Sequence, residues 1–414
     1  MYKRVVITGV GVLAPKSVGK TQFWKTLQEG KSGISKLSRF DSSNYRSRIA
    51  GEIDINISDQ LSYKKTHRLS LFSQLALIAA KDAIEDSQFD LMKVPTEDIG
   101  VVFGTAAGGM DKAEKEHDVM REKGLQRVNP LFTAAYIPNA ASGEVSVEFD
   151  IKGLNLTIST ACSSGANAIG YAFESIRHGK ATIVIAGAAE TPLNPLTYGA
   201  FSIAHQLSAL NDFPDQAARP FERNRDGMVL SEGSAVIILE ELKHALARDA
   251  KIYAEVVGYG VTADAYSMQT LEPTGGSASR AIDLAMKMAK LNHDDIDYIC
   301  AHAVGSLLGD RKETNAIKKS FKDYAYGIPI SSIKSMIGHP FGASGALQVV
   351  ASLLPINRNI IPPTINFDIK DPECDLNYVP NSAIKKKVNT VLLNSFGLGG
   401  NNASLIIKKL DKVS

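Results

Sequence analysis

The sequence is poor in cysteine. It has three in 414 residues, Cys162, Cys300 and Cys374, and each stands alone. Neither the even number of a disulfide framework nor the paired spacing of a zinc site is present. We therefore expect a reducing, cytoplasmic setting and no metal site.

The sequence also lacks an apolar run near the ~18–20 residues that span a membrane, and its N-terminal stretch lacks the apolar core of a signal peptide. We expect no membrane partner.

An excess of one charge is missing as well. The chain has 46 basic and 44 acidic side chains, a net charge of +2. That balance argues against a dedicated nucleic-acid-binding protein, although a local basic patch for an acidic partner stays open. Hydrophobic residues make up 44% and charged residues 22%, which is ordinary for a globular protein. Because single cores stop growing at ~250–300 residues, the length predicts two domains or two fused halves.

Segments rich in Val and Ile alternate with helical segments along most of the chain, which is typical of an α/β protein with buried sheets. The pattern begins again near residue 250. We therefore predict a pseudo-duplication on architecture alone, with halves at 1–250 and 251–414. The strands expected in the first half are 3–13, 99–105, 181–190 and 232–242, and those in the second half are 253–263, 296–303, 327–335 and 390–409.

The segment STACSSGANAIG, Ser159–Gly170, contains the first candidate for chemistry. Cys162 stands where an apolar strand gives way to a segment with helical spacing. The unpaired N–H groups and the dipole at a helix N-terminus favour the thiolate form, which is the nucleophile. The alternative is structural, because a free cysteine is commonly a small core residue.

Two histidines in the second half strengthen the catalytic interpretation. His302 ends one predicted buried strand, and His339 follows another in the glycine-flanked turn IGHPFG. Strand ends are where α/β folds display catalytic groups. Either histidine alone could be a hydrogen-bonded core residue. The later segment NSFGLGGNNAS is a glycine-rich turn, which either brings backbone N–H groups close to a reacting carbonyl or forms a tight hairpin.

Together these segments resemble the β-ketoacyl-acyl-carrier-protein synthases, the condensing enzymes of fatty-acid and polyketide synthesis. The resemblance runs from VVITGVGVLAP through RPFERNRDGMVLSEGSA to PPTINF and the glycine-rich turn, and it is strongest to the elongating type with a Cys-His-His site. It implies a thiolase-like fold, in which two duplicated α/β halves form a layered α-β-α-β-α arrangement. It also implies an acyltransferase that performs a decarboxylative condensation.

The resemblance assigns roles to matching residues. Cys162 would carry an acyl group taken from a carrier protein, and His302 and His339 would bind the carbonyl of a malonyl thioester and stabilise the enolate formed as CO2 leaves. The N–H groups of Cys162 and Phe396 would form the oxyanion hole, with Phe396 also acting as a gate. Lys334 matches the lysine that supports the second histidine.

Further positions follow from the same resemblance. Asp310 and Glu313 match acidic residues that order the site. Val304 and Ser306 stand where the family places threonines that hold the phosphopantetheine arm, and Gly399 lies in the glycine-rich turn, so we expect these three to contact substrate. Ala107 matches the floor of the acyl pocket, where a small side chain would leave room for a longer or stiffer chain.

The sequence departs from the family pattern at these threonines and at two other positions. Val304 cannot donate the hydrogen bond of a threonine, which puts binding of the arm in doubt. Gln348 replaces a usual glutamate, and Asn401 replaces a common threonine. These changes suggest a specialised synthase, from a polyketide or other secondary pathway.

The resemblance implies an acyl carrier protein as partner and a homodimer, or a heterodimer with a sister subunit. It implies no resident cofactor, since phosphopantetheine arrives on the carrier protein.

One alternative function is that of a malonyl-carrier-protein decarboxylase or of a chain-length partner that does not elongate. Inactive partners typically lack the cysteine, which this chain retains. A thiolase has little support, because Cys374 precedes the glycine-rich turn. A nucleotide-binding loop has even less support, because no third glycine follows Gly9 and Gly11 at the spacing of the phosphate-binding fingerprint.

Overall fold

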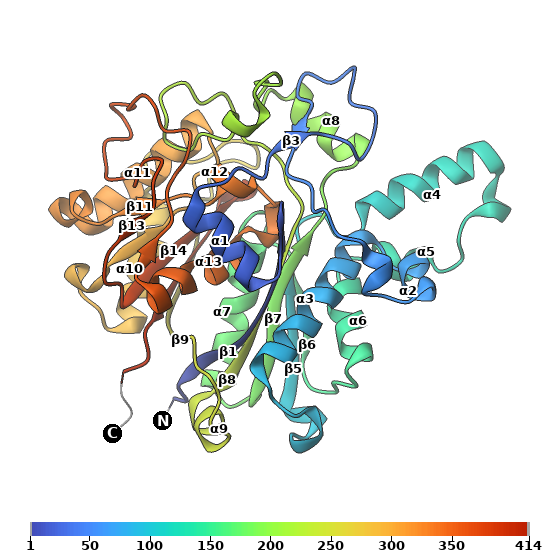
Figure 1. The fold of residues 1–414 in the computed structure, drawn as a ribbon, viewed down its shortest axis with the longest axis horizontal. Helices are drawn as coiled ribbons and strands as arrows, with labels where there is room; N and C mark the ends of the chain where they lie inside the picture. The colour runs from blue at the N-terminus through green and yellow to red at the C-terminus, as the bar shows by residue number, and fades with distance from the viewer. Residues whose placement is uncertain (1, 412–414) are drawn as a thin grey trace.

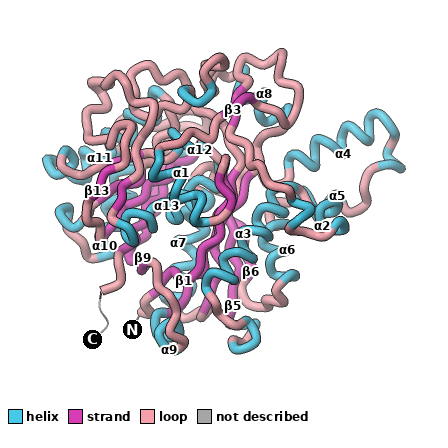
Figure 2. The backbone as a smooth tube through the Cα atoms, in the orientation of Figure 1, coloured by secondary structure: helices cyan, strands magenta, loops and turns pink. Residues whose placement is uncertain are grey.

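The computed structural model describes residues 2–411, and its centre is one mixed sheet to which both halves contribute. Figure 2 shows the strands gathered inside the molecule, with helices and loops around them. The first half contributes β1 (Val5–Ala14), β5 (Ile99–Gly104), β6 (Asn155–Ile158), β7 (Ile183–Glu190) and β8 (Gly233–Glu241). The second half contributes β9 (Ala254–Ala263), β10 (Tyr298–Cys300), β11 (Ile330–Ser331), β14 (Thr390–Gly397) and β15 (Asn401–Lys408).

The two halves have the same strand order. Across the sheet the order is β6-β5-β7-β8-β1 in the first half and β11-β10-β14-β15-β9 in the second, so each half places its own strands in the sequence third, second, fourth, fifth, first. The directions also agree, because in each half the second strand is parallel to the third and fourth and the remaining pairs are antiparallel. The predicted duplication of an α/β unit is confirmed at the level of the fold.

The halves meet at their first strands. Val5, Val6 and Ile7 of β1 pair antiparallel with Val256, Glu255 and Ala254 of β9, which joins the two sets of strands into one sheet. The largest apolar cluster contains residues from both halves, from Val5 to Ile407. The first half ends with α9 (Leu242–Ala247), and β9 begins at Ala254. Between them the chain passes from β8 to β9, which lie on either side of β1 in the sheet.

Helices form layers on both faces of the strands. Helices α7 and α13 pack against each other and against strands of both halves, and therefore form the inner layer (Figure 1). α3 and α6 cover the outer face of the first half, and α10, with α11 packed against it, covers that of the second. Their bounds are α3 (Leu71–Ser87), α6 (Ala140–Glu148), α7 (Ser164–Arg177), α10 (Gly276–Ala289), α11 (Leu307–Phe321) and α13 (Ser344–Arg358). This is the layered arrangement that the family resemblance implied.

Smaller elements lie at the periphery. In Figure 1, α4 projects from the body of the molecule beside α5 and α2. The remaining helices are α1 (Lys20–Glu29), α2 (Tyr63–Arg68), α4 (Met110–Lys123), α5 (Phe132–Tyr136), α8 (Pro195–Ile203) and α12 (Lys334–Ile337). The short strands are β2 (Ser17–Val18), β3 (Ser35–Lys36), β4 (Ile49–Ala50), β12 (Ile360–Ile361) and β13 (Ile384–Lys385).

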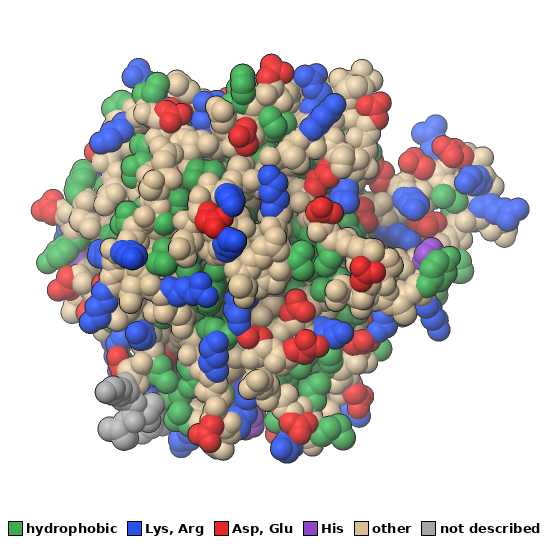
Figure 3. Space-filling view, viewed as in Figure 1, with side chains coloured by type: hydrophobic (Ala, Val, Ile, Leu, Met, Phe, Trp, Pro, Cys, Tyr) green, Lys and Arg blue, Asp and Glu red, His purple; other side chains and the backbone are tan. Residues whose placement is uncertain are grey.

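The surface agrees with the balanced composition. On the face in Figure 3, acidic and basic side chains are interspersed and neither sign forms a continuous region. Among residues 2–411, no helix has the length and apolar character that crossing a membrane requires.

Candidate active site

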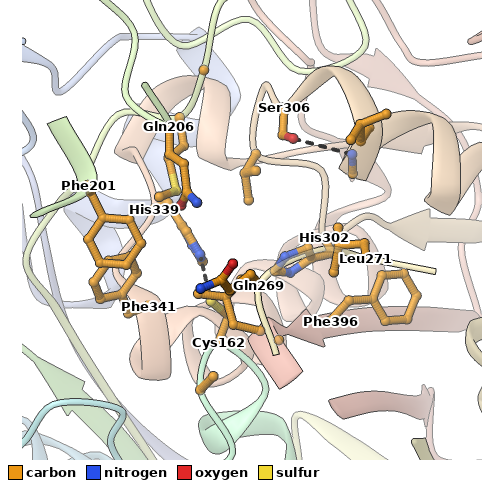
Figure 4. A pocket seen from close by; sticks show the side chains of 18 of the residues that line it. Cys162, Phe201, Gln206, Gln269, Leu271, His302, Ser306, His339, Phe341 and Phe396 are labelled. Carbon is orange, nitrogen blue, oxygen red and sulfur yellow. Dashed lines mark hydrogen bonds between the residues drawn. The ribbon is translucent and has the colours of Figure 1, made fainter. Parts of the chain in front are cut away.

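A cavity of about 620 Å³ contains most of the predicted site residues. Its lining combines the loop after β5, the turn before α7, helix α8, the start of α11 and the turn between β14 and β15 (Figure 4). Of the residues predicted from the sequence it includes Ala107, Cys162, His302, Val304, Ser306, Asp310, His339 and Phe396. The topology therefore brings residues from both halves to one cavity.

Cys162 lies at a sharp turn between β6 and α7. The preceding residue, Ala161, has φ of 51°, a left-handed conformation that costs energy for a residue with a Cβ. Helix α7 begins at Ser164, two residues after the cysteine. The Ser395 hydroxyl donates a hydrogen bond of 3.0 Å to the carbonyl oxygen of Cys162, which ties this turn to β14. The strained turn thus presents the thiol to the cavity.

The two histidines reach the thiol from the second half. His339 Nε2 lies 3.1 Å from Cys162 Sγ, and the rings of His302 and His339 are nearly perpendicular with centroids 5.5 Å apart. His302 follows β10 by two residues, as predicted. His339 does not follow its strand directly, because the one-turn helix α12 intervenes. Figure 4 shows Cys162 and both imidazoles facing the same space.

Burial changes the titration of all three groups. It raises the pKa of the Cys162 thiol to about 11, although Lys334 and the N–H groups of Leu398 and Cys162 act in the opposite direction. The pKa values of His302 and His339 lie well below the ordinary 6.5, because of burial and then the positive charge of Lys334. This differs from the expectation of a cysteine poised as thiolate, because desolvation of the thiol outweighs the effect of the helix N-terminus on its pKa. At neutral pH the site holds a thiol and two neutral imidazoles.

Lys334 serves the first histidine as well as the second. Its Nζ donates a hydrogen bond of 2.6 Å to the carbonyl oxygen of His302 and makes no hydrogen bond to the His339 ring. Burial lowers the pKa of Lys334 to about 8, against the opposing effect of Cys300 and Glu313. The contact differs from the support of the second histidine that the resemblance implied. Lys334 therefore acts on both histidines through its charge, and it also holds His302 through a backbone hydrogen bond.

Glu313 fixes the backbone around His302. Its carboxylate accepts hydrogen bonds from the N–H groups of His302, at 2.9 Å, and Ala303, at 2.7 Å. Asn394 donates a third bond of 3.1 Å. Burial raises the Glu313 pKa to about 7. The alternative of a solvated helix face is excluded, because Glu313 is fully buried.

Asp310 fixes the backbone of the segment that follows, around Val304. It accepts hydrogen bonds from the N–H groups of Val304, at 3.1 Å, and Phe221, at 2.8 Å, and it contacts the Arg225 guanidinium at 3.4 Å. With its backbone held, the Val304 side chain lies on the cavity wall. Ser306 accepts a hydrogen bond of 3.3 Å from the Gly309 N–H, so its hydroxyl caps α11.

The contacts of Gln348 account for an amide where the family usually has a glutamate. The NH2 group of its side chain faces three backbone carbonyl oxygens, those of Cys300 at 3.2 Å, Ala301 at 2.9 Å and Asn394 at 2.9 Å, which share its two hydrogens. A carboxylate has no donor for these oxygens when ionised. At this buried position the amide therefore holds β10 and β14 together just before His302.

The oxyanion-hole prediction needs a correction. The backbone N–H that hydrogen-bonds the Cys162 sulfur, besides that of Cys162 itself, belongs to Leu398 and not to Phe396. Phe396 lies inside β14 opposite Asn402, and its side chain is buried in the apolar cluster of the second half beside the His302 ring. Leu398 lies two residues further along, where the chain has left the strand and lines the cavity. The backbone N–H beside the sulfur is therefore that of Leu398.

Gly399 also differs from its prediction. It has φ of 74° and faces the Met268 side chain, whose atoms lie 3.3 Å from the place of a Cβ. It is not part of the cavity lining, which in this segment consists of Phe396, Gly397 and Leu398. The motif identified the right turn but not which of its residues faces the substrate space.

Several lining residues had no signal in the sequence. Phe201 and Phe341 form one wall, with ring centroids 4.9 Å apart, and Phe341 also contacts the His339 ring at 5.5 Å. Gln206 and Gln269 also line the cavity and appear in Figure 4. Among residues 2–411, no three His, Cys, Asp or Glu side chains are grouped so that they could hold a metal ion.

Comparison with known families decides the assignment. Residues 2–245 match the model "Beta-ketoacyl synthase, N-terminal domain", and residues 253–368 match "Beta-ketoacyl synthase, C-terminal domain". The chain belongs to the β-ketoacyl synthase family. The expected class of enzyme, an acyltransferase that performs decarboxylative condensation, is thereby confirmed.

Relatives from two kinds of pathway are about equally similar to this synthase. The 3-oxoacyl-[acyl-carrier-protein] synthase 2 of Coxiella burnetii is 41% identical over 409 residues, covering 99% of each chain. The tetracenomycin polyketide synthase ketoacyl synthase alpha subunit of Streptomyces glaucescens is 43% identical, covering 98% of this chain and 97% of its own.

Solved structures agree with the fold. A ketosynthase described as bound to the hexaketide, in complex with its type II polyketide acyl carrier protein, matches with a TM-score of 0.91 and 34% identity, covering 99% of this chain and all of its own. The ishigamide ketosynthase/chain length factor matches with a TM-score of 0.93 and 30% identity over the same shares. The thiolase-like fold is confirmed by these neighbours.

Proposed function

We propose that Cys162 carries the acyl group and that His302 and His339 act on the malonyl unit of a decarboxylative condensation, in a specialised polyketide or fatty-acid pathway. The observation that carries the proposal is the 3.1 Å contact between Cys162 Sγ and His339 Nε2, with His302 beside them, in a cavity whose lining is mainly apolar. Neutral imidazoles suit this role, since each can donate an N–H to a carbonyl on which negative charge develops.

The first step is acyl transfer. The thiol adds to the carbonyl carbon of an acyl thioester, its proton passes to the departing sulfur of the carrier, and the carrier leaves as a thiol. Because the Cys162 pKa is about 11, the thiol must lose its proton during the attack. The N–H groups of Leu398 and Cys162, which hydrogen-bond the sulfur, are placed to receive the thioester oxygen afterwards.

The second step forms the carbon–carbon bond. A malonyl thioester enters, its carbonyl oxygen accepts N–H bonds from His302 and His339, and cleavage of the bond to the carboxylate releases CO2. The electron pair left behind attacks the acyl carbon on Cys162, and the cysteine leaves as thiolate and regains a proton. The product is a β-ketoacyl carrier protein. No resident cofactor is needed, since phosphopantetheine arrives on the carrier.

An acyl carrier protein is the partner we propose for delivering both substrates. For a second subunit we infer contact along β6, because this strand ends the sheet and its neighbourhood is apolar: Leu156 is 39% exposed and Val147 is 76% exposed. An exposed strand edge with apolar flanks is suited to pairing with another chain. Native mass spectrometry of the protein, alone and with a candidate sister subunit, tells a homodimer from a heterodimer; a monomer in both samples would contradict the inference.

Intact-protein mass spectrometry tests the catalytic assignment. The protein is incubated with a set of acyl carrier proteins, with and without malonyl carrier protein. The expected result is acyl mass on the wild type and on a Cys374→Ala control, none on Cys162→Ala, and β-ketoacyl carrier protein only when both substrates are present. Acyl mass on Cys162→Ala would contradict the assignment. CO2 release without β-ketoacyl product would instead identify a decarboxylase.

A further inference from the structure

One buried carboxylate beside the cavity has no part in the mechanism above. Glu190 is the last residue of β7 and has no exposed surface. Burying an ionised carboxylate is costly unless hydrogen bonds compensate for the lost water. The neighbours of Glu190 therefore indicate what the residue is for.

The Glu190 carboxylate has four hydrogen-bond partners, and each of them is a donor. Oε1 accepts from the Thr105 hydroxyl and the Ala107 N–H, both at 3.1 Å. Oε2 accepts from the N–H groups of Ala106, at 2.6 Å, and Gly342, at 3.0 Å. An ionised carboxylate matches this arrangement fully, whereas a protonated acid or an amide would turn a donor toward another donor. Burial raises its pKa to about 7 against the effect of these bonds.

These donors come from two segments far apart in the chain. Thr105, Ala106 and Ala107 form the loop that follows β5, while Gly342 belongs to the tight turn after His339. The two segments are in close contact: a Cβ on Gly342 would lie 2.5 Å from Glu190 Oε2 and 2.6 Å from the Ala106 nitrogen. Glu190 is thus a joint between the halves of the molecule.

Both segments also form the wall of the cavity. Ala106, Ala107 and Phe341 line it. Phe341 has φ of 33°, an unfavourable conformation that its surroundings must hold. The hydrogen bond from the next residue, Gly342, to Glu190 holds this turn. The backbone of His339 is held separately, because its own N–H donates to the Val229 carbonyl at 2.7 Å, although the His339 ring contacts Phe341.

We propose that Glu190 is a positioning residue for acyl-chain selection: its carboxylate fixes the loop of Ala107 against the turn of Phe341 and so sets the shape of the acyl cavity. The proposal rests on the proposed function only in taking an acyl chain as occupant of this cavity. Glu190 touches no reacting atom. Its loss should blur the choice among acyl chains and leave decarboxylation, which depends on separately held histidines, largely intact.

The test compares Glu190→Gln with the wild type. The amide keeps the size of the side chain but replaces one acceptor oxygen with a donor. We measure kcat/KM for acyl loading onto Cys162 over a series of chains that differ by two carbons. A well-formed pocket discriminates a single methylene by about 10- to 200-fold. We expect the preference of the wild type for its best chain over the next longer one to fall about tenfold in the variant. CO2 release from malonyl carrier protein should stay within about twofold.

Two further variants keep the result unambiguous. Glu240→Gln is the matched control, since Glu240 is also fully buried, lies in the neighbouring strand β8 and bonds to Arg248, away from the cavity. It should lower thermal stability without changing the chain-length profile. Thr105→Val removes one of the four donors and keeps the carboxylate; it should reduce the preference in the same direction by a smaller factor, and it decides the question if Glu190→Gln does not fold.

A chain-length profile equal to that of the wild type in both Glu190→Gln and Thr105→Val would overturn the proposal. So would a uniform loss of loading and decarboxylation, because that outcome indicates a general structural role. A protein that loads acyl groups but forms no β-ketoacyl product would refute condensation, yet its loading profile would still test Glu190. The two failures are therefore distinguishable.

Discussion

The Nε2 atom of His339 lies 3.1 Å from the Sγ atom of Cys162, and both groups are uncharged at neutral pH. The pair is therefore a hydrogen-bonded thiol and imidazole and not a thiolate–imidazolium pair. Burial is the first cause on both sides, since it raises the pKa of an acid and lowers that of a base. The nucleophile is formed only when a substrate arrives to share its proton and its charge.

The first prediction concerns the pH dependence of this thiol. With a pKa of about 11, the thiolate fraction of Cys162 rises about tenfold per pH unit between pH 7 and 10. The rate of alkylation by iodoacetamide, followed by mass spectrometry, should rise with the same slope. A plateau reached below pH 8 would show that the thiolate is already formed in the free protein. Cys162→Ala supplies the background rate from Cys300 and Cys374.

The second prediction separates the roles of the histidines. His302→Ala and His339→Ala should each slow CO2 release from malonyl carrier protein by roughly 100-fold, the usual cost of losing one donor to a developing oxyanion. Acyl loading onto Cys162 should remain measurable in both. His178→Ala, an exposed histidine whose ring contacts the Glu174 carbonyl, is the control. An equal loss of loading and decarboxylation would refute this division of roles.

The third prediction concerns Val304 on the cavity wall. Its N–H is held by Asp310, so Val304→Thr changes the side chain without moving the backbone. The added hydroxyl should improve kcat/KM with generic, non-partner carrier proteins more than with the natural partner, by about tenfold for each ~1.4 kcal/mol regained. High turnover of a generic carrier by the wild type would remove the reason to regard Val304 as a mark of specialisation.

The fourth prediction uses Ala107, whose N–H is anchored on Glu190 while the residue lines the cavity. Ala107→Met should fill the end of the acyl cavity. We expect the preferred acyl chain to shorten by at least one two-carbon unit, since each misfitting methylene costs about 10-fold or more in kcat/KM. Loading assays across a chain-length series measure the shift. An unchanged optimum would mean that the chain does not reach this loop.

Much of this site was predictable from local patterns. Cys162 and His302 stand at ends of apolar runs, and such ends gather at one edge of an α/β sheet. The backbone N–H at the Cys162 sulfur belongs to Leu398 and not to Phe396, and no local pattern could show this. Both residues are apolar and lie two positions apart in one glycine-rich turn. Only the pairing of Phe396 with Asn402 reveals that the strand still continues there.

Other features depended on packing that no pattern shows. The Cys162 pKa is set by desolvation, which the helix-start argument omitted and which has the larger effect. The hydrogen-bond partner of Lys334 is a backbone carbonyl, and because every residue has one, the sequence does not indicate which carbonyl accepts. Glu190 did have a signal: an acidic residue closing the apolar run IVIAGAAE is costly to bury and hence needs a reason.

The repeated strand order has a consequence for how activity depends on folding. The cysteine belongs to the first copy of the unit and both histidines to the second, so neither copy contains a catalyst by itself. The two copies touch through β1 and β9, through α7 and α13, and through Glu190 and Gly342. Activity therefore depends on how closely the two copies pack against each other, even when every strand and helix within each copy is intact.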